Sequence, residues 1–222
     1  MLDFSNSKIL IVGDVMLDKY YFGKVDRISP EAPVPIVNIQ KEESRLGGAS
    51  NVANNIVSLG GHSLLCGVIG HDLFGKEIER ISRHKNIDTF LLKTSSPTIT
   101  KARIIGGKQQ IVRVDYEDKS ELNADNKKLF RDTISRILPE YDILVISDYG
   151  KGLISEDLCR YLIKLAHKYD KKVIIDPKGK NWEKYSGADI VTPNVKELSD
   201  IVGYTVPNTD RAIEKAAREA IT

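Results

Sequence analysis

Short runs of apolar residues recur along the chain, and stretches with helical spacing of apolar positions separate them. The runs at 143–146 and 173–175 are typical of strands buried on both faces of a parallel sheet. Similar runs predict strands at 9–12, 63–67, 89–92 and 190–191. Periodic apolar positions predict helices at 52–59, 74–83, 126–138, 156–169 and 211–221. Strands that alternate with helices predict an α/β fold, a parallel sheet between two helical layers.

Two parts of the chain depart from this alternation. Residues 20–23 and 34–40 show the partial alternation of a sheet with one buried face, and so do 98–105 and 110–116. The second pair forms a predicted hairpin that turns at Gly106-Gly107, where positive φ is easy. We therefore expect a small antiparallel β lid outside the main sheet, with strands at approximately 19–42 and 98–116. A surface hairpin without function is the alternative.

The charge balance excludes some classes of partner. The net charge is +2, from 33 basic and 31 acidic residues mixed along the chain, so no basic stripe indicates nucleic acid. The apolar runs are far shorter than the ~20 residues of a membrane span, and residues 1–7 lack the features of a secretory signal. We expect a cytoplasmic protein with neither nucleic acid nor membrane as partner.

The cysteines and histidines do not group into a metal site. Cys66 and Cys159 have no CxxC neighbour and fit buried thiols in a reduced compartment. The four histidines are dispersed among polar residues, which favours surface positions over metal ligation.

The glycine pair Gly47-Gly48, followed by Asn51, precedes the first predicted helix. Two glycines let backbone N–H groups approach a ligand closely at a helix N-terminus, and the Asn amide offers a donor and an acceptor. The local alternative is a glycine-rich turn with Ser50 or Asn51 as the helix cap.

Several further motifs accompany the glycine pair in a fixed order. They are Gly13-Asp14-Val15-Met16-Leu17-Asp18, Thr100-Lys101-Ala102-Arg103, Ser147-Asp148-Tyr149-Gly150-Lys151-Gly152, Asp176-Pro177-Lys178-Gly179 and Thr192-Pro193-Asn194-Val195-Lys196-Glu197. In this order and spacing the set resembles the ribokinase-like (PfkB-type) carbohydrate kinases. Residues 27–35, Arg-Ile-Ser-Pro-Glu-Ala-Pro-Val-Pro, narrow the resemblance to the heptose 7-phosphate kinase domain of ADP-heptose synthesis. The resemblance extends from residue 8 to residue 202.

The resemblance implies a ribokinase-like three-layer fold and an activity. The activity is ATP-dependent phosphorylation of D-glycero-β-D-manno-heptose 7-phosphate at the anomeric hydroxyl, giving the 1,7-bisphosphate, with ATP and Mg²⁺ as cofactors. It also implies a homodimer formed through the β lid and allows a fused adenylyltransferase domain. A kinase of another phosphosugar and a sugar-phosphate-binding module without catalysis remain alternatives.

The resemblance also assigns substrate-binding residues. Asp18 matches the position whose carboxylate takes two sugar hydroxyls, and Asp14 is the weaker candidate; Gly47, Gly48 and Asn51 would lie opposite. Either acid could instead cap a turn.

Cationic and acidic residues elsewhere complete the expected substrate site. Lys101 and Arg103 are two residues apart, so they share one face of a lid strand, and their charges suit the 7-phosphate. Arg113 is a less favoured candidate for the same phosphate contact. Exposed lid charges could also be only solvated. Asp148 follows a buried strand and is a further candidate at the sheet edge.

Three residues match nucleotide-binding positions of the resembled family. Lys178 is expected near the transferring phosphate, and Asn194 and Glu197 are expected to organise phosphates and Mg²⁺, Glu197 through water. The local alternatives are a type I turn at 176–179 and an Asn cap with Glu in the first helical turn.

One family motif is absent from the sequence. The resembled domain has a Gly-Ala-Gly-Asp motif that supplies the catalytic base and the anion hole, and none occurs in residues 1–222. We therefore expect 1–222 to be the N-terminal two-thirds of one C-terminally truncated sugar-kinase domain, with the base beyond Thr222 and no activity in isolation. A dinucleotide-binding domain is disfavoured, because no G-x-G-x-x-G follows the first strand.

Overall fold

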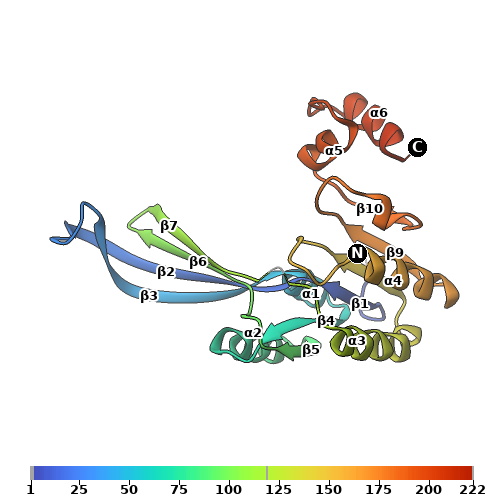
Figure 1. Ribbon diagram of the computed structural model, residues 1–222, viewed down its shortest axis with the longest axis horizontal. Helices are drawn as coiled ribbons and strands as arrows, with labels where there is room; N and C mark the ends of the chain where they lie inside the picture. The colour runs from blue at the N-terminus through green and yellow to red at the C-terminus, as the bar shows by residue number, and fades with distance from the viewer. Residues whose placement is uncertain (1–2, 119, 222) are drawn as a thin grey trace.

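The computed structural model describes residues 3–118 and 120–221, which form a six-stranded parallel sheet with helices on both faces (Figure 1). The strands lie in the order β10-β9-β8-β1-β4-β5. They are β1 (Lys8–Gly13), β4 (His62–Gly70), β5 (Asp88–Thr94), β8 (Ile143–Ser147), β9 (Lys172–Asp176) and β10 (Ile190–Val191). The predicted α/β fold with a parallel sheet is confirmed.

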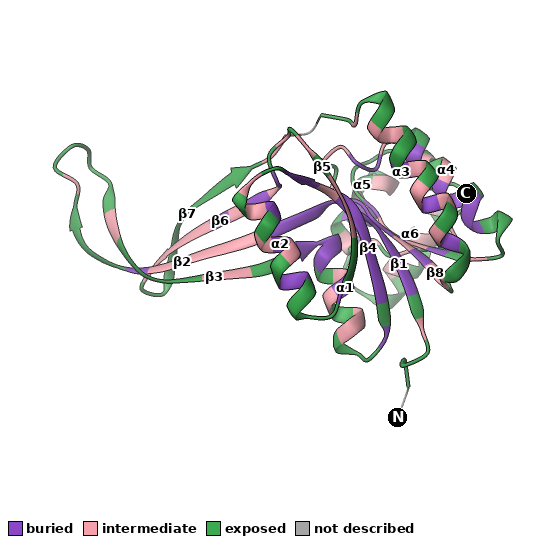
Figure 2. Ribbon diagram, turned by 90° about the horizontal axis from the view of Figure 1, so that it is seen from below, coloured by how far each residue is buried: buried purple, intermediate pink, exposed green. Residues whose placement is uncertain are grey.

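The side chains of β1 alternate between two hydrophobic layers. Leu10 and Val12 pack in one cluster with α3 (Ala124–Ile137) and α4 (Glu156–Lys168). Ile9 and Ile11 pack in the other with α1 (Ala49–Ser58) and α2 (Leu73–His84). Because successive strand residues point to opposite faces, one apolar run supplies both layers, and Figure 2 shows these strands as the buried centre.

Two short helices add single side chains to the core, Leu138 and Tyr185, whereas the last two helices form a cluster of their own. The short helices η1 (Leu138–Glu140) and η2 (Glu183–Tyr185) belong to connections. Helices α5 (Val195–Val202) and α6 (Asp210–Ile221) pack on each other around Leu198, Val206 and Ala216 (Figure 1). In the part of the chain that the structure describes, no helix is long and apolar enough to cross a bilayer.

The lid is a second, four-stranded sheet that projects from the main one (Figure 1). It contains β2 (Val15–Ile28), β3 (Pro35–Gly48), β6 (Thr100–Gly106) and β7 (Gln109–Tyr116), in the order β3-β2-β6-β7. The expected turn is present after Gly106, with Gly107 at φ +63°.

The lid is a mixed sheet, which corrects the expectation of a purely antiparallel one. The β2–β3 and β6–β7 hairpins are antiparallel, but β2 and β6 pair in parallel. The reason is the origin of the two strands: β2 leaves the carboxyl end of β1, and β6 follows the carboxyl end of β5. Parallel strands end at the same edge of a sheet, so both lid strands run outward in the same direction.

A hydrogen-bond cluster at Asp72 fixes the connection between β5 and β6. Asp72 caps α2 by accepting from Gly75 N at 2.8 Å, and it also accepts from Thr98 N and Thr98 Oγ1, both at 2.7 Å. Thr98 Oγ1 in turn accepts from Gly70 N at 2.8 Å. The chain that enters the lid is therefore held against the end of β4.

Both cysteines are buried in the core, and we expect neither to be alkylated in the native protein. Burial raises the pKa of Cys159 to about 12 and raises that of Cys66 as well. Because the thiolate is the nucleophile, iodoacetamide at pH 8 should modify both residues only after unfolding in urea. Mass spectrometry of the native and unfolded protein checks this. Rapid alkylation of the native protein would contradict the burial of the thiols.

Candidate functional site

Gly48 lets the start of α1 pack against the junction of β1 and β2. It has φ +54°, and a Cβ at this position would lie 2.4 Å from the Asp14 carbonyl oxygen. Ala49 N donates a hydrogen bond to that same oxygen at 3.0 Å. A side chain at position 48 would therefore push the helix away from the strand junction.

Gly47 lets the backbone approach Asp18, as Gly48 lets it approach Asp14. A Cβ at Gly47 would lie 2.6 Å from Asp18 Oδ2. Ser50 stabilises the connection between β3 and α1, because its hydroxyl donates to Gly47 O at 2.6 Å and lies 3.1 Å from Met16 O. Gly48 is the N-cap of α1 and no side chain caps it, so the alternative of Ser50 or Asn51 as the cap is not observed.

The lid presents a row of charged side chains around Asp18. In the strand register Asp18 lies opposite Arg45 of β3 and Lys101 of β6, so all three share one face. Arg103, two residues further along β6, donates to Asp18 Oδ1 from Nη1 at 2.5 Å. The guanidinium groups of Arg45 and Arg103 lie 4.9 and 5.2 Å from the Tyr20 ring centroid. Arg45 is also paired with Glu43 at 2.8 Å, and Asp115 lies opposite Lys101 in the register, so cations and carboxylates alternate along this face around Asp18.

These residues line a pocket of about 610 Å³ between the lid, α1 and the end of α2, here called the lid pocket. Of the expected substrate-binding residues, the pocket brings together Asp18, Gly47, Gly48, Asn51, Lys101 and Arg103. Its charged side chains are one carboxylate, Asp18, and four cations: Arg45, Lys85, Lys101 and Arg103. The lining therefore suits a hydroxyl-rich ligand that carries negative charge.

The lid pocket is also lined by Arg45, Lys85 and Tyr149. Of these, only Tyr149 belongs to a motif that the sequence analysis singled out. Strand alternation could have found Arg45, because it lies two residues before Gly47 and shares its face of β3. No local signal marks Lys85, which follows the end of α2 and reaches the pocket only through the packing of that helix. Arg113 lies outside the pocket lining and bonds to Asp115 at 2.8 Å.

Asp14 and Asp148, the other two expected substrate residues, lie outside the lid pocket and hold the loop after β8. Asp14 is 2% exposed, and its Oδ2 accepts from Tyr149 N at 2.8 Å and Lys151 N at 3.1 Å. Asp148 is also 2% exposed; its Oδ1 accepts from Gly150 N at 2.7 Å. A buried carboxylate needs such partners, so both acids shape the loop rather than the pocket wall.

A buried network anchors Asp148 to η2. Its Oδ2 accepts from the Tyr185 hydroxyl at 2.7 Å and from Lys184 Nζ at 2.5 Å. The Tyr185 hydroxyl also accepts from Lys178 N at 2.9 Å. The loops that follow β8 and β9 are therefore joined through one tyrosine, which the sequence did not single out.

The loop after β8, which Asp14 and Asp148 hold, places Tyr149 in the wall of the lid pocket. Lys101 Nζ lies 5.8 Å from the centroid of its ring. Burial raises the pKa of the Tyr149 hydroxyl, and the nearby Asp176 charge raises it further. Tyr149 therefore stays a neutral phenol, which can donate a hydrogen bond at the border between the lid pocket and the end of β9.

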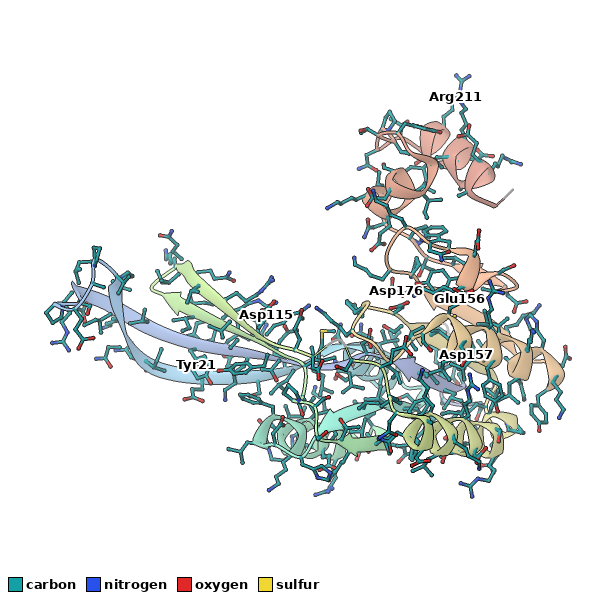
Figure 3. All side chains as sticks on the ribbon, in the orientation of Figure 1. Tyr21, Asp115, Glu156, Asp157, Asp176 and Arg211 are labelled. Atoms are coloured by element: carbon teal, nitrogen blue, oxygen red, sulfur yellow. The ribbon has the colours of Figure 1, made fainter. Side chains whose placement is uncertain are left out.

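A second polar cluster lies at the ends of β9 and β10. Lys178 Nζ bonds Glu197 Oε1 at 2.9 Å, and this bond raises the pKa of Lys178. Asn194 Oδ1 accepts from Glu197 N at 2.9 Å while Glu197 Oε2 accepts from Asn194 N at 3.1 Å, a complete capping box. The local alternative for this pair is thus observed. Asp176, at the end of β9 in Figure 3, has its pKa raised by burial and then by Glu197.

The carboxylates of this cluster are the candidates for a magnesium contact, and their hydrogen bonds bear on how such a contact would be made. Both carboxylate oxygens of Glu197 already accept a hydrogen bond. Within residues 3–118 and 120–221, no three acidic, histidine or cysteine side chains group as metal ligands. Mg²⁺ commonly keeps several waters and binds substrate phosphates with few carboxylates, so Asp176 and Glu197 fit this role.

Comparison with known proteins shows the family of the chain. The model of the pfkB family carbohydrate kinases matches residues 6–222. The chain is 48% identical over 193 residues to "Bifunctional protein HldE" of Helicobacter pylori, which covers 86% of this chain and 42% of that protein. It is 43% identical over 215 residues to "D-beta-D-heptose 7-phosphate kinase" of Bordetella bronchiseptica, over 96% of this chain and 67% of that protein.

Solved structures share the fold at low sequence identity. Phosphofructokinase-2 from Escherichia coli superposes with a TM-score of 0.73 at 20% identity, over 97% of this chain and 70% of that chain. Arabidopsis thaliana ribokinase superposes with a TM-score of 0.69 at 18% identity, over 97% of this chain and 68% of that chain. The chain spans about two fifths of the length of its bifunctional relatives. Family match, identity and fold agree: the chain belongs to the pfkB family of carbohydrate kinases.

Proposed function

We propose that the chain binds the sugar phosphate in an ATP-dependent kinase of D-glycero-β-D-manno-heptose 7-phosphate, acting at the anomeric hydroxyl to give the 1,7-bisphosphate for ADP-heptose synthesis. The observation that carries the proposal is the lid pocket, in which Asp18 lies among four cations. The name of the relative from Bordetella bronchiseptica, a heptose 7-phosphate kinase, supports the choice of sugar.

In this proposal the two ends of the sugar meet different parts of the lid pocket. Asp18 accepts two hydroxyls, while Gly47 and Gly48 allow close backbone approach and Asn51 offers its amide from the first turn of α1. Arg103 and Lys101 take the 7-phosphate, since a guanidinium fork matches phosphate oxygens. The Asp18–Arg103 bond would then give way to bonds with the sugar and the phosphate.

The polar cluster at the ends of β9 and β10 is the proposed nucleotide side. Lys178 would contact the transferring phosphate as a point charge, and Asn194 and Glu197 would hold the ATP phosphates and water-bound Mg²⁺. When bound, Mg²⁺ neutralises charge on the phosphate oxygens. The Arabidopsis thaliana ribokinase that shares this fold is complexed with ribose and ATP, which supports a sugar and a nucleotide as the ligands of the fold. We place the reaction in the cytoplasm, where ATP is available.

The lid is the proposed dimer surface. Several of its apolar side chains are exposed, among them Val25, Ile28, Val112 and Val114. A second copy of the chain would cover them. The name and the greater length of the bifunctional relatives support a fused adenylyltransferase domain in the whole protein. Light scattering of the purified chain tests the dimer.

Binding and transfer can be tested separately. Calorimetry on the 222-residue chain should show tighter binding of D-glycero-β-D-manno-heptose 7-phosphate than of the unphosphorylated heptose or fructose 6-phosphate. ADP release by the full-length protein, with ATP and Mg²⁺, should depend on the same sugar phosphate. Preferential turnover of fructose 6-phosphate would favour the alternative of a kinase for another phosphosugar.

A further inference from the structure

The hydroxyl of Tyr185 joins two loops at the carboxyl edge of the main sheet. Tyr185 lies in the short helix η2 and is 3% exposed. Its hydroxyl donates to Asp148 Oδ2 at 2.7 Å, in the loop after β8, and accepts from Lys178 N at 2.9 Å, in the loop after β9. One buried oxygen atom therefore contacts both loops, although the proposed function gives Tyr185 no role.

The two hydrogen bonds use different parts of the hydroxyl. An ionised carboxylate only accepts, so Tyr185 donates its single proton to Asp148, and a lone pair of its oxygen remains for Lys178 N. Burial raises the pKa of the Tyr185 hydroxyl, so the hydroxyl keeps this proton. Tyr185 Oη also lies 3.1 Å from Lys178 O. Both polar backbone groups of Lys178 therefore lie against the hydroxyl.

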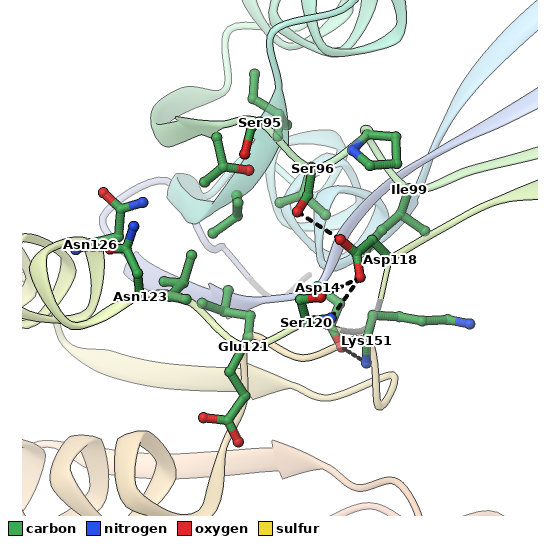
Figure 4. Close-up of a pocket in the computed structure, with 17 residues that line it drawn as sticks. Asp14, Ser95, Ser96, Ile99, Asp118, Ser120, Glu121, Asn123, Asn126 and Lys151 are labelled. Carbon is green, nitrogen blue, oxygen red and sulfur yellow. Dashed lines mark hydrogen bonds between the residues drawn. The ribbon is translucent and has the colours of Figure 1, made fainter.

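The loop after β8 has other anchors besides Tyr185. Asp148 Oδ2 also accepts from Lys184 Nζ at 2.5 Å. On its other side the loop is held by Asp14, which accepts from Lys151 N at 3.1 Å (Figure 4). Loss of the Tyr185 hydroxyl would therefore leave this loop in place beside the lid pocket.

The turn that carries Lys178 depends more strongly on Tyr185. Lys178 is the second residue after β9, and its side chain is 50% exposed and bonds Glu197 at 2.9 Å. In the proposed function Lys178 Nζ turns toward a phosphate, and its bond with Glu197 then weakens. The contact between Tyr185 and the backbone of Lys178 does not have to change, so it fixes the point from which the lysine side chain extends.

We propose that Tyr185 is a positioning residue: its hydroxyl fixes the backbone of Lys178, so that the ammonium group of Lys178 meets the transferring phosphate. This role of Tyr185 rests on the proposed function, in which Lys178 contacts that phosphate. Tyr185 itself touches no substrate in this arrangement. Because a small displacement of a catalytic group slows the transfer strongly, loss of the hydroxyl should lower kcat more than it changes KM.

The first test is steady-state kinetics of the full-length protein with heptose 7-phosphate, ATP and Mg²⁺, followed by ADP release. Tyr185→Phe removes the hydroxyl and keeps the ring, and it should lower kcat about tenfold or more. The KM values for the sugar phosphate and for ATP should change less than about threefold, because the lid pocket and Glu197 are unaltered. The matched control is Tyr204→Phe, which removes a hydroxyl that bonds Glu219 at 2.8 Å and should leave kcat unchanged.

A double-mutant cycle shows whether Tyr185 acts through Lys178. Lys178→Met removes the ammonium group and should lower kcat by itself. In that background Tyr185→Phe should lower kcat less than about twofold, since no ammonium group remains to be positioned. An equal loss of kcat in both backgrounds would overturn the proposal. Unchanged kcat in Lys178→Met would instead contradict the proposed phosphate contact, and with it the role of Tyr185.

A second measurement, on the isotope-labelled 222-residue chain, does not depend on turnover. Amide hydrogen exchange followed by NMR should be at least about tenfold faster at Lys178 in Tyr185→Phe, because its N–H loses an acceptor. The amides of Leu144 and Ile146 in β8 should keep their exchange rates, which shows that the variant is folded. If they do not, the comparison is made in an Asp148→Asn background, with Asp148→Asn alone as the reference. Unchanged exchange at Lys178 would overturn the proposal.

Discussion

Replacing Lys184 by Met is expected to lower the free energy of unfolding by about 3–5 kcal/mol, because it leaves a buried carboxylate without its cation. Lys184 Nζ lies 2.5 Å from Asp148 Oδ2, and the two side chains are 16% and 1% exposed. Methionine fills a similar volume but provides no charge. Urea denaturation followed by circular dichroism measures the loss.

The control for this prediction is an ion pair on the surface. Lys172 lies 2.7 Å from Asp189 but is 74% exposed, so Lys172→Met should cost at most about 1 kcal/mol. Repeating Lys184→Met in an Asp148→Asn background should reduce its cost, since the neutral amide no longer needs a cation. Equal losses for Lys184 and Lys172 would show that the Asp148 network is not important for stability.

Arg103→Ala is expected to weaken binding of heptose 7-phosphate by about 1.5–3 kcal/mol, the range for a hydrogen bond to a charged group. This prediction rests on the proposed phosphate contact in the lid pocket. The unphosphorylated heptose should lose little affinity, because Asp18 remains and is freed from its bond with Arg103. Calorimetry with both sugars gives the ratio of affinities, which should fall in the variant.

Arg113 provides a matched control on the neighbouring strand. It lies directly opposite Arg103 in the register of β6 and β7, but its guanidinium bonds Asp115. Arg113→Ala should therefore leave the preference for the phosphorylated sugar unchanged. If Arg103→Ala weakened both sugars equally, its role would be to support the lid rather than to bind phosphate.

The layers of the fold could be predicted because the information is local. Apolar runs such as 143–146 predicted buried strands, and helical spacing predicted α1 to α4 and α6. The predicted ends of a strand were wrong where the strand continues from a neighbouring one. The strand predicted at 20–23 is the middle of β2, which begins at Val15 because the chain continues directly from β1. Local patterns do not report such continuations.

The pairing of the lid could not be predicted from the same patterns. Alternation indicates that 98–105 and 110–116 are strands, but it is the same for parallel and antiparallel neighbours. The parallel pairing of β2 with β6 depends on where each strand leaves the main sheet. That depends on the order of strands in the sheet, which is a tertiary property.

The sequence by itself determined the parallel α/β sheet and the lid hairpins, because periodicity and turn glycines are properties of neighbouring residues. The family that its motifs resemble supplied the candidates that gather in the lid pocket. Only the tertiary structure decided that Asp18 lies in the lid pocket while Asp14, four positions earlier, is buried outside it and accepts hydrogen bonds from Tyr149 N and Lys151 N. It also brought Lys85 to the lid pocket and Lys184 to Asp148. The physical reason is that burial and charge pairing depend on side chains that meet in space from distant segments, and no spacing along the chain reports which segments meet.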